Sequence, residues 1–233
     1  NQLSGILIEQ IEPCTIDVDP TITNVLISGN GHLIDNNNSQ GAVHLKGASP
    51  KFINATIVNN VYNQGAGIYF DYSNPQNPFF SLNNNNPIFI NSIIYNNQPI
   101  SYFENIEDVD VSTYSNPSFS HSNFVEIILE NWEDLGGNIN MNPEFFDSEN
   151  GDYTLQEGSP CIDAGTADID GDGVDDITNF IGLAPDMGAY EYGIGSEQIT
   201  GDFNHDGLVD ILDIVGLVSG LVNYTLTDDD MQN

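Results

Sequence analysis

The residues from Asp202 to Asp213 carry oxygen donors at a spacing that suits calcium. The stretch reads Asp-Phe-Asn-His-Asp-Gly-Leu-Val-Asp-Ile-Leu-Asp, and an apolar stripe at helical spacing follows it. Calcium takes about six to eight hard oxygen ligands on a tightly curved loop, which glycine at the sixth position allows. We therefore predict a calcium loop followed by a helix, against the alternative of a metal-free acidic loop. The expected ligands are Asp202, Asn204, Asp206, Leu208 through its backbone carbonyl, Asp210 and Asp213.

A second acidic loop, Asp-Ile-Asp-Gly-Asp-Gly-Val-Asp-Asp, begins at Asp168. It repeats most of the same donor spacing, but Asn179 stands where the last ligand would be and no amphipathic helix follows. Calcium is the favoured interpretation and a solvated turn is the alternative. The expected ligands are Asp168, Asp170, Asp172, Val174 through its carbonyl, and Asp176.

Catalytic chemistry has only weak candidates in this sequence. His44 and Lys46 lie two residues apart on one predicted strand face and are the best available pair of bases. A solvated outer face explains this pair better. Paired carboxylates could cleave glycosidic bonds, but nothing in the spacing of Asp71, Asp108 and Asp110 selects a pair. We therefore predict no catalytic residue.

Aromatic residues could form a platform for sugars, because sugars stack on flat rings. The candidates for ligand binding are Tyr69, Tyr72, Phe79 and Trp132. Ordinary packing of a long loop is the alternative.

The charge balance excludes two classes of partner. The chain of 233 residues has 35 acidic residues, two Lys and no Arg, for a net charge of −33. Nucleic acid needs a basic patch, and so does an anionic membrane surface, so we expect neither partner and no membrane insertion. Such a surface instead favours divalent cations.

Three stretches share one pattern of residues and indicate a stacked array. They begin at Pro20, Pro50 and Pro87 and read PTITNVLISGN, PKFINATIVNN and PIFINSIIYNN. Stacking would place Ile22, Phe52 and Phe89 in one apolar column. The same stacking would place Asn24, Asn54 and Asn91 in a buried column of amides that bond to one another.

This repeat resembles the right-handed parallel β-helix proteins, the fold of pectate lyases and many extracellular adhesins, over roughly Gly5 to Ile162. The resemblance implies an all-β solenoid whose connecting turns vary in length. Further strands are expected within 5–11, 42–45, 67–72, 109–114 and 124–129. A β-sandwich of short strands is the alternative fold.

The loop and helix after Asp202 resemble one repeat of a type I dockerin, a module that binds cohesin through two such repeats. The sequence holds one repeat, so a cohesin-like partner depends on a second. We expect three regions: β-helix coils at 1–165, a calcium-loop cap at 166–195, and a half dockerin-like module at 196–233.

The two cysteines, Cys14 and Cys161, are expected to be buried thiols, because several stacked coils would hold them too far apart for a disulfide. A secreted setting would favour pairing, which stays the alternative. An Asn-rich, Lys-poor solenoid is typical of proteins at the cell surface or outside the cell. We also expect the chain to be a mature or excised fragment.

Together these features predict an extracellular, calcium-stabilised scaffold or adhesin that associates with polysaccharide without cleaving it. Two alternatives stay open: the C-terminal part of a secreted polysaccharide lyase or glycoside hydrolase, and a subunit of an extracellular filament.

Overall fold

The computed structural model describes residues 5–9, 19–31, 41–62, 66–71, 86–99, 109–110, 115–124 and 132–193. The chain divides into two units, residues 1–192 and 193–233, and all of the second except Gly193 lies outside the described residues. Within the described ranges every element is a strand, and no helix there is long and apolar enough to cross a membrane.

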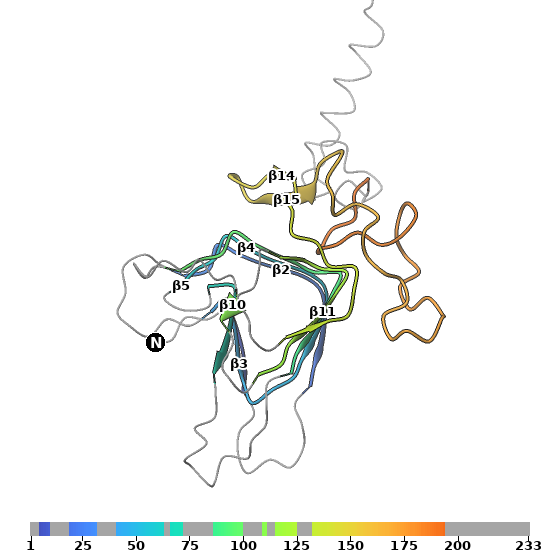
Figure 1. Cartoon of the computed structure of the whole chain (residues 1–233). Coiled ribbons are helices and arrows are strands. Elements are labelled where there is room, and N and C mark those ends of the chain that lie inside the picture. The colour runs from blue at the N-terminus through green and yellow to red at the C-terminus, as the bar shows by residue number, and fades with distance from the viewer. Residues whose placement is uncertain are drawn as a thin grey trace, which may run out of the picture. The chain divides into compact units, whose positions relative to one another are not determined.

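Successive coils of the chain place strands in the same parallel sheets (Figure 1). The first sheet contains, in order, β1 (Ile6–Glu9), β3 (Val43–Lys46), β6 (Ile68–Asp71) and β10 (Val109–Asp110). The second contains β2 (Thr21–Ser28), β4 (Lys51–Val58), β7 (Ile88–Ile90), β8 (Ile93–Tyr95), β11 (Ser118–Ser120), β12 (Asn123–Phe124) and β13 (Glu133–Asp134). A third pairs β5 (Val61–Tyr62) with β9 (Gln98–Pro99). All these pairings are parallel, so the predicted right-handed parallel β-helix is confirmed.

Four coils enter the second sheet at a proline, which has no N–H to donate and therefore suits the start of a strand. The proline carbonyls accept backbone N–H groups of the next coil at 2.9–3.0 Å: Lys51 on Pro20, Ile88 on Pro50, Ser118 on Pro87 and Glu133 on Pro117. Pro117 thus begins a fourth repeat, which the sequence pattern did not reveal because His121 stands in place of the asparagine.

The predicted apolar column forms the centre of the core. The Phe52 and Phe89 rings stack with centroids 5.1 Å apart, and Phe89 and Phe119 stack at the same distance. Ile22 lies in register with Phe52 and packs against this core at the N-terminal end of the column. Direct stacking of identical rings requires the parallel, in-register coils that the repeat predicts.

The predicted asparagine column forms, but at a corner and not on the inner strand face. Asn91 donates from Nδ2 to Oδ1 of Asn54 at 3.2 Å, and Asn54 donates likewise to Asn24 at 3.1 Å. All three have a positive φ of 50–52°, and His121 takes the same corner with a φ of 45°. A left-handed residue interrupts the alternation of side chains along the strand, so the inference from two-residue spacing was wrong for these asparagines. Asn24 is exposed and Asn54 is half-buried, whereas Asn91 is fully buried, as predicted.

The buried amide ladder lies instead at the last residue of each repeat. Asn60 and Asn97 are fully buried. Asn30 donates from Nδ2 to Oδ1 of Asn60 at 3.1 Å, and Asn60 donates to Oδ1 of Asn97 at 2.8 Å. Backbone N–H groups of Asn30 and Asn60 reach the same oxygens, which fixes the orientation of the amides.

Residues 145–192, here called the flank segment, pack against the side of the coils (Figure 1). The segment opens with an antiparallel hairpin, β14 (Phe145–Asp147) and β15 (Asp152–Leu155). Its apolar residues form a second core with Val58 and Ile93 of the coils: Tyr153, Leu155, Cys161 and Met187. Two further contacts join Gly188 N–H to the Asn91 carbonyl and Ala189 N–H to Thr56 Oγ1, at 2.7 and 2.9 Å. These contacts lie on a lateral face of the coils. The sequence analysis expected this part of the chain to cap the end of the stack instead.

Candidate metal site

The acidic loop that begins at Asp168 is closed at its base by one carbonyl. The Ala167 oxygen accepts the N–H groups of Asp176 and Ile177 at 2.9 and 3.0 Å. Two glycines, Gly171 and Gly173, have φ values of 78° and 88°, which residues with a Cβ rarely adopt. The Asp-Gly-Asp-Gly sequence therefore permits the tight curvature that a metal loop needs.

Asp168 is held in place by the loop's own backbone. Its two oxygens accept the N–H groups of Gly171 and Gly173, at 2.7 and 2.8 Å. The N–H of Gly173 is the largest cause that lowers the pKa of Asp168, and other N–H groups of the loop add to it. The carboxylate is thus kept ionised, which is the form that binds a cation.

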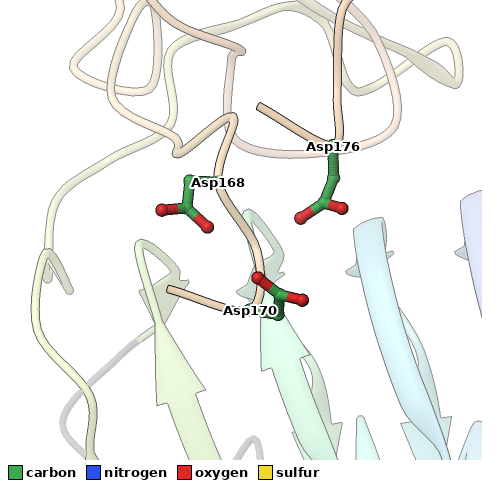
Figure 2. A group of neighbouring side chains, drawn as sticks. All are labelled: Asp168, Asp170 and Asp176. Carbon is green, nitrogen blue, oxygen red and sulfur yellow. The ribbon is translucent and has the colours of Figure 1, made fainter. Parts of the chain in front are cut away.

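Three carboxylates of the loop converge on one point. Asp168, Asp170 and Asp176 each offer an oxygen, and these oxygens lie within 4.8 Å of one another (Figure 2). Three hard, negatively charged oxygens at this spacing fit calcium, since the charges repel one another and a divalent cation offsets that repulsion. Calcium at this loop stays a prediction supported by this geometry.

The other two predicted ligands of the loop are placed differently. Asp172 accepts the Val174 N–H at 2.8 Å and is not one of the three converging carboxylates. Val174 itself is 65% exposed. The six predicted ligands of the first loop, from Asp202 to Asp213, lie outside the described residues.

The loop is joined to the coils through Asn91, which belongs to the corner ladder formed by Asn24, Asn54 and Asn91. The Thr166 N–H donates to Oδ1 of Asn91 at 2.8 Å, and Nδ2 of Asn91 donates to the Thr166 carbonyl at 2.9 Å. The Thr166 hydroxyl then donates to the Asp168 carbonyl at 3.0 Å. Sequence reasoning missed this joint, because 75 residues separate its two members and no pattern relates them.

The weak catalytic candidates lie side by side on β3 with different surroundings. Lys46 Nζ is 2.7 Å from Oε1 of Glu9 on the neighbouring strand β1. His44 alternates with the inward-facing Val43 and Leu45, yet its side chain is only 3% exposed and packs edge-on against Tyr69. The expected solvated outer face is therefore wrong for His44. His44 is therefore not accessible as a base, and Lys46 is held in an ion pair at a partly exposed position.

Two of the four aromatic candidates can be placed. Tyr69 packs against His44 with ring centroids 5.2 Å apart. Trp132 is half-buried and covers the end of the phenylalanine column, contacting Phe119 and Phe124 edge-on at 5.9 and 5.6 Å. Trp132 thus packs against the core, as expected under the alternative of ordinary packing. Tyr72 and Phe79 lie outside the described residues.

Cys161 is a fully buried free thiol, as predicted. Asn123 donates from Nδ2 to its sulfur at 3.2 Å, and burial raises the pKa of the thiol to about 11. Cys14 lies outside the described residues.

Comparison with solved structures finds a weak similarity. The crystal structure of the pectate lyase Pel9A is similar to this chain with a TM-score of 0.34 and 11% sequence identity. The match covers 81% of this chain and 64% of the lyase chain, which is less than two-thirds of the lyase. No protein-family model matches the sequence, and a search of curated proteins finds no match. The described chain is, by its own strands, a parallel β-helix.

Proposed function

We propose that the chain is an extracellular, calcium-stabilised β-helix scaffold that associates with polysaccharide and does not cleave it. The observation that carries the proposal is the convergence of Asp168, Asp170 and Asp176 on a loop bonded to the coils through Thr166 and Asn91. A cation bound there would fix the loop and, through Thr166, tighten the flank segment on the solenoid.

Two features of the described coils support a role without catalysis. Lys46 is engaged by Glu9, and His44 is buried against Tyr69. The net charge of −33 would also repel an acidic polymer unless cations bridge the two. Neutral polysaccharides, or acidic ones in the presence of calcium, are thus the preferred ligands.

The C-terminal residues 196–233 supply the second part of the proposal. Their resemblance to one dockerin repeat suggests a second calcium site and an attachment role. A cohesin-like partner would require a second repeat of the same kind.

A glycoside hydrolase is the second candidate, and one register observation favours it. Asp110 of β10 pairs with Tyr69 of β6, and Asp71 follows two residues later on the same strand. Two acidic positions therefore occupy neighbouring strands, a placement compatible with the paired carboxylates of glycoside hydrolases.

A panel of neutral and uronic polysaccharides tests both candidates, with calcium and with EDTA. Pull-down of intact polymer without new reducing ends or unsaturated products would support the scaffold. Product that disappears in the Asp71→Asn, Asp110→Asn double variant, but not in Glu149→Gln at an exposed turn, would establish the hydrolase instead. Neither binding nor product, together with a calcium-dependent rise in particle mass, would point to a filament subunit.

A further inference from the structure

Three carboxylates of the flank segment each accept backbone N–H groups of the same segment. Asp186 is 1% exposed; its Oδ1 accepts the Asp163 N–H at 2.7 Å, and its Oδ2 accepts the Tyr192 N–H. Glu191 Oε1 in turn accepts the Asp186 N–H at 3.0 Å. We call Asp163, Asp186 and Glu191 the carboxylate clasp.

Asp163 closes the clasp from the other side. Its Oδ1 accepts the N–H groups of Leu183 and Ala184 at 2.6 and 3.2 Å. This approach requires Gly182, because a Cβ there would lie 2.1 Å from the same oxygen. The clasp therefore joins the residues around 163 to those around 182–192.

One oxygen of the clasp has no donor. Glu191 Oε2 is buried and makes no hydrogen bond within the described part of the chain. The sequence contains no Lys or Arg after Lys51, so basic side chains are scarce as partners for this oxygen. A buried carboxylate oxygen with neither donor nor counter-charge is costly, and protonation removes most of that cost.

The surroundings of Glu191 favour its neutral form. Burial is the main cause that raises the pKa of Glu191 above its ordinary value of 4.5, and the charges of Asp186 and Asp163 add to it, while the backbone N–H groups of Asp186 and Ile181 act in the opposite direction without cancelling it. Burial likewise raises the pKa of Asp186. The Cys161 thiol, which also faces Asp186, has a pKa of about 11 and stays uncharged.

We propose that the folded chain holds one proton on Oε2 of Glu191, and that this proton fastens the flank segment to the coils. Asp186 is a less favourable site for the proton, because both its oxygens already accept backbone N–H groups. Glu191 can be protonated at Oε2 and still accept a hydrogen bond at Oε1. Gly188 and Ala189, which bond to Asn91 and Thr56 of the coils, lie between these two residues. Repulsion between the carboxylates of the clasp therefore acts directly on Gly188 and Ala189, the residues that bond to the coils.

The direction of the pH dependence follows from the raised folded-state pKa. The stabilisation is fully present below the ordinary value of 4.5 and is lost as pH rises through the raised value in the folded chain. The grip of the flank segment on the coils should weaken toward alkaline pH.

The test compares the whole chain with two variants that each remove one negative charge. Glu191→Gln mimics the protonated side chain, and Glu149→Gln removes an exposed carboxylate from a turn of the same segment. Melting temperatures are measured in EDTA from about pH 4 to about pH 8. At the alkaline end, Glu191→Gln should melt about 2–4 °C above wild type, and at the acid end the two should coincide. Hydrogen exchange at Gly188 and Ala189 should accelerate with pH beyond the intrinsic rate in wild type only.

A direct titration covers the case in which the glutamine does not fit. The carboxyl carbon of Glu191, assigned by its absence in Glu191→Gln, is followed by NMR in the wild-type chain. A midpoint well above that of Glu149 supports the proposal. A midpoint at or below that of Glu149 overturns it, and so do equal pH profiles for the two glutamine variants.

Discussion

Asn91 and Thr166, which are 75 residues apart, exchange two hydrogen bonds between the side-chain amide of one and the backbone of the other. The same Asn91 side chain also donates to Asn54 of the corner ladder. One asparagine therefore belongs both to the repeat that stacks the coils and to the joint that holds the acidic loop that begins at Asp168.

Replacing Asn91 should loosen the flank segment more than it disturbs the coils. Asn91→Gly keeps the positive φ of the corner and removes three side-chain hydrogen bonds. We expect a loss of about 1–3 kcal/mol in the free energy of unfolding, measured by urea denaturation. Asn24→Gly is the matched control at the exposed end of the same ladder and should cost less. Equal losses of unfolding free energy for the two variants would contradict a stabilising role for the bonds between Asn91 and Thr166.

Calcium should raise thermal stability, and the gain should depend on the converging carboxylates. Asp168→Asn and Asp172→Asn remove the same charge, but only Asp168 belongs to the group of three. We expect Asp168→Asn to weaken calcium binding at this loop by isothermal titration, with a smaller effect from Asp172→Asn. Because the Asp202 loop could also bind calcium, both variants are compared with Asp206→Asn.

The buried ladder should be more sensitive to substitution than an exposed asparagine at a corner. Asn60→Ala leaves the Ile27 carbonyl and the Asn30 backbone N–H without their present partners. Unsatisfied buried groups cost about 1–3 kcal/mol each, so we expect a loss of several kcal/mol by chemical denaturation. Asn96→Gly removes the exposed side-chain bonds to Asn59 and Gln98, which belong to neither of these columns, at a corner with a φ of 54°, and should cost about 1 kcal/mol or less. A smaller effect at Asn60 than at Asn96 would refute the ranking.

The Cys161 thiol should resist modification in the folded chain. Its pKa of about 11 means that thiolate forms only as pH rises far above neutrality, and the side chain is fully buried. In a Cys14→Ser background, a thiol reagent at about pH 8 should react slowly until urea unfolds the chain. Rapid reaction without denaturant would show that the second core opens readily.

The repeat made much of the coil stack predictable. Direct stacking of Phe52 on Phe89 follows from their equal places in the pattern. The expected ranges 5–11, 67–72 and 109–114 contain β1, β6 and β10, the range 42–45 overlaps β3, and the range 124–129 shares only Phe124 with β12 within the described residues. The fourth repeat was missed because its corner residue is His121, which shares with asparagine only a tolerance for positive φ.

Side-chain placement was less predictable than strand placement. Spacing by two residues assumes an uninterrupted strand, and the left-handed corner at Asn54 breaks that assumption. In the Asp168 loop the donor pattern identified the residues, while the choice of Asp176 over Asp172 depends on backbone hydrogen bonds within the turn. The clasp could have been suspected only from carboxylates that recur without any nearby basic residue.

The two asparagine columns point in opposite directions along the stack. In the corner column each amide donates toward the preceding coil, from Asn91 to Asn54 to Asn24, whereas Asn30 and Asn60 donate toward the following coil. Their side-chain dipoles therefore oppose one another, unlike the aligned peptide dipoles of an α-helix. Adding a coil extends both columns, so the partial charge that one builds up at an end of the stack is offset by the other; the exposed Asn96–Asn59 bond, which also runs toward the preceding coil, is screened by water.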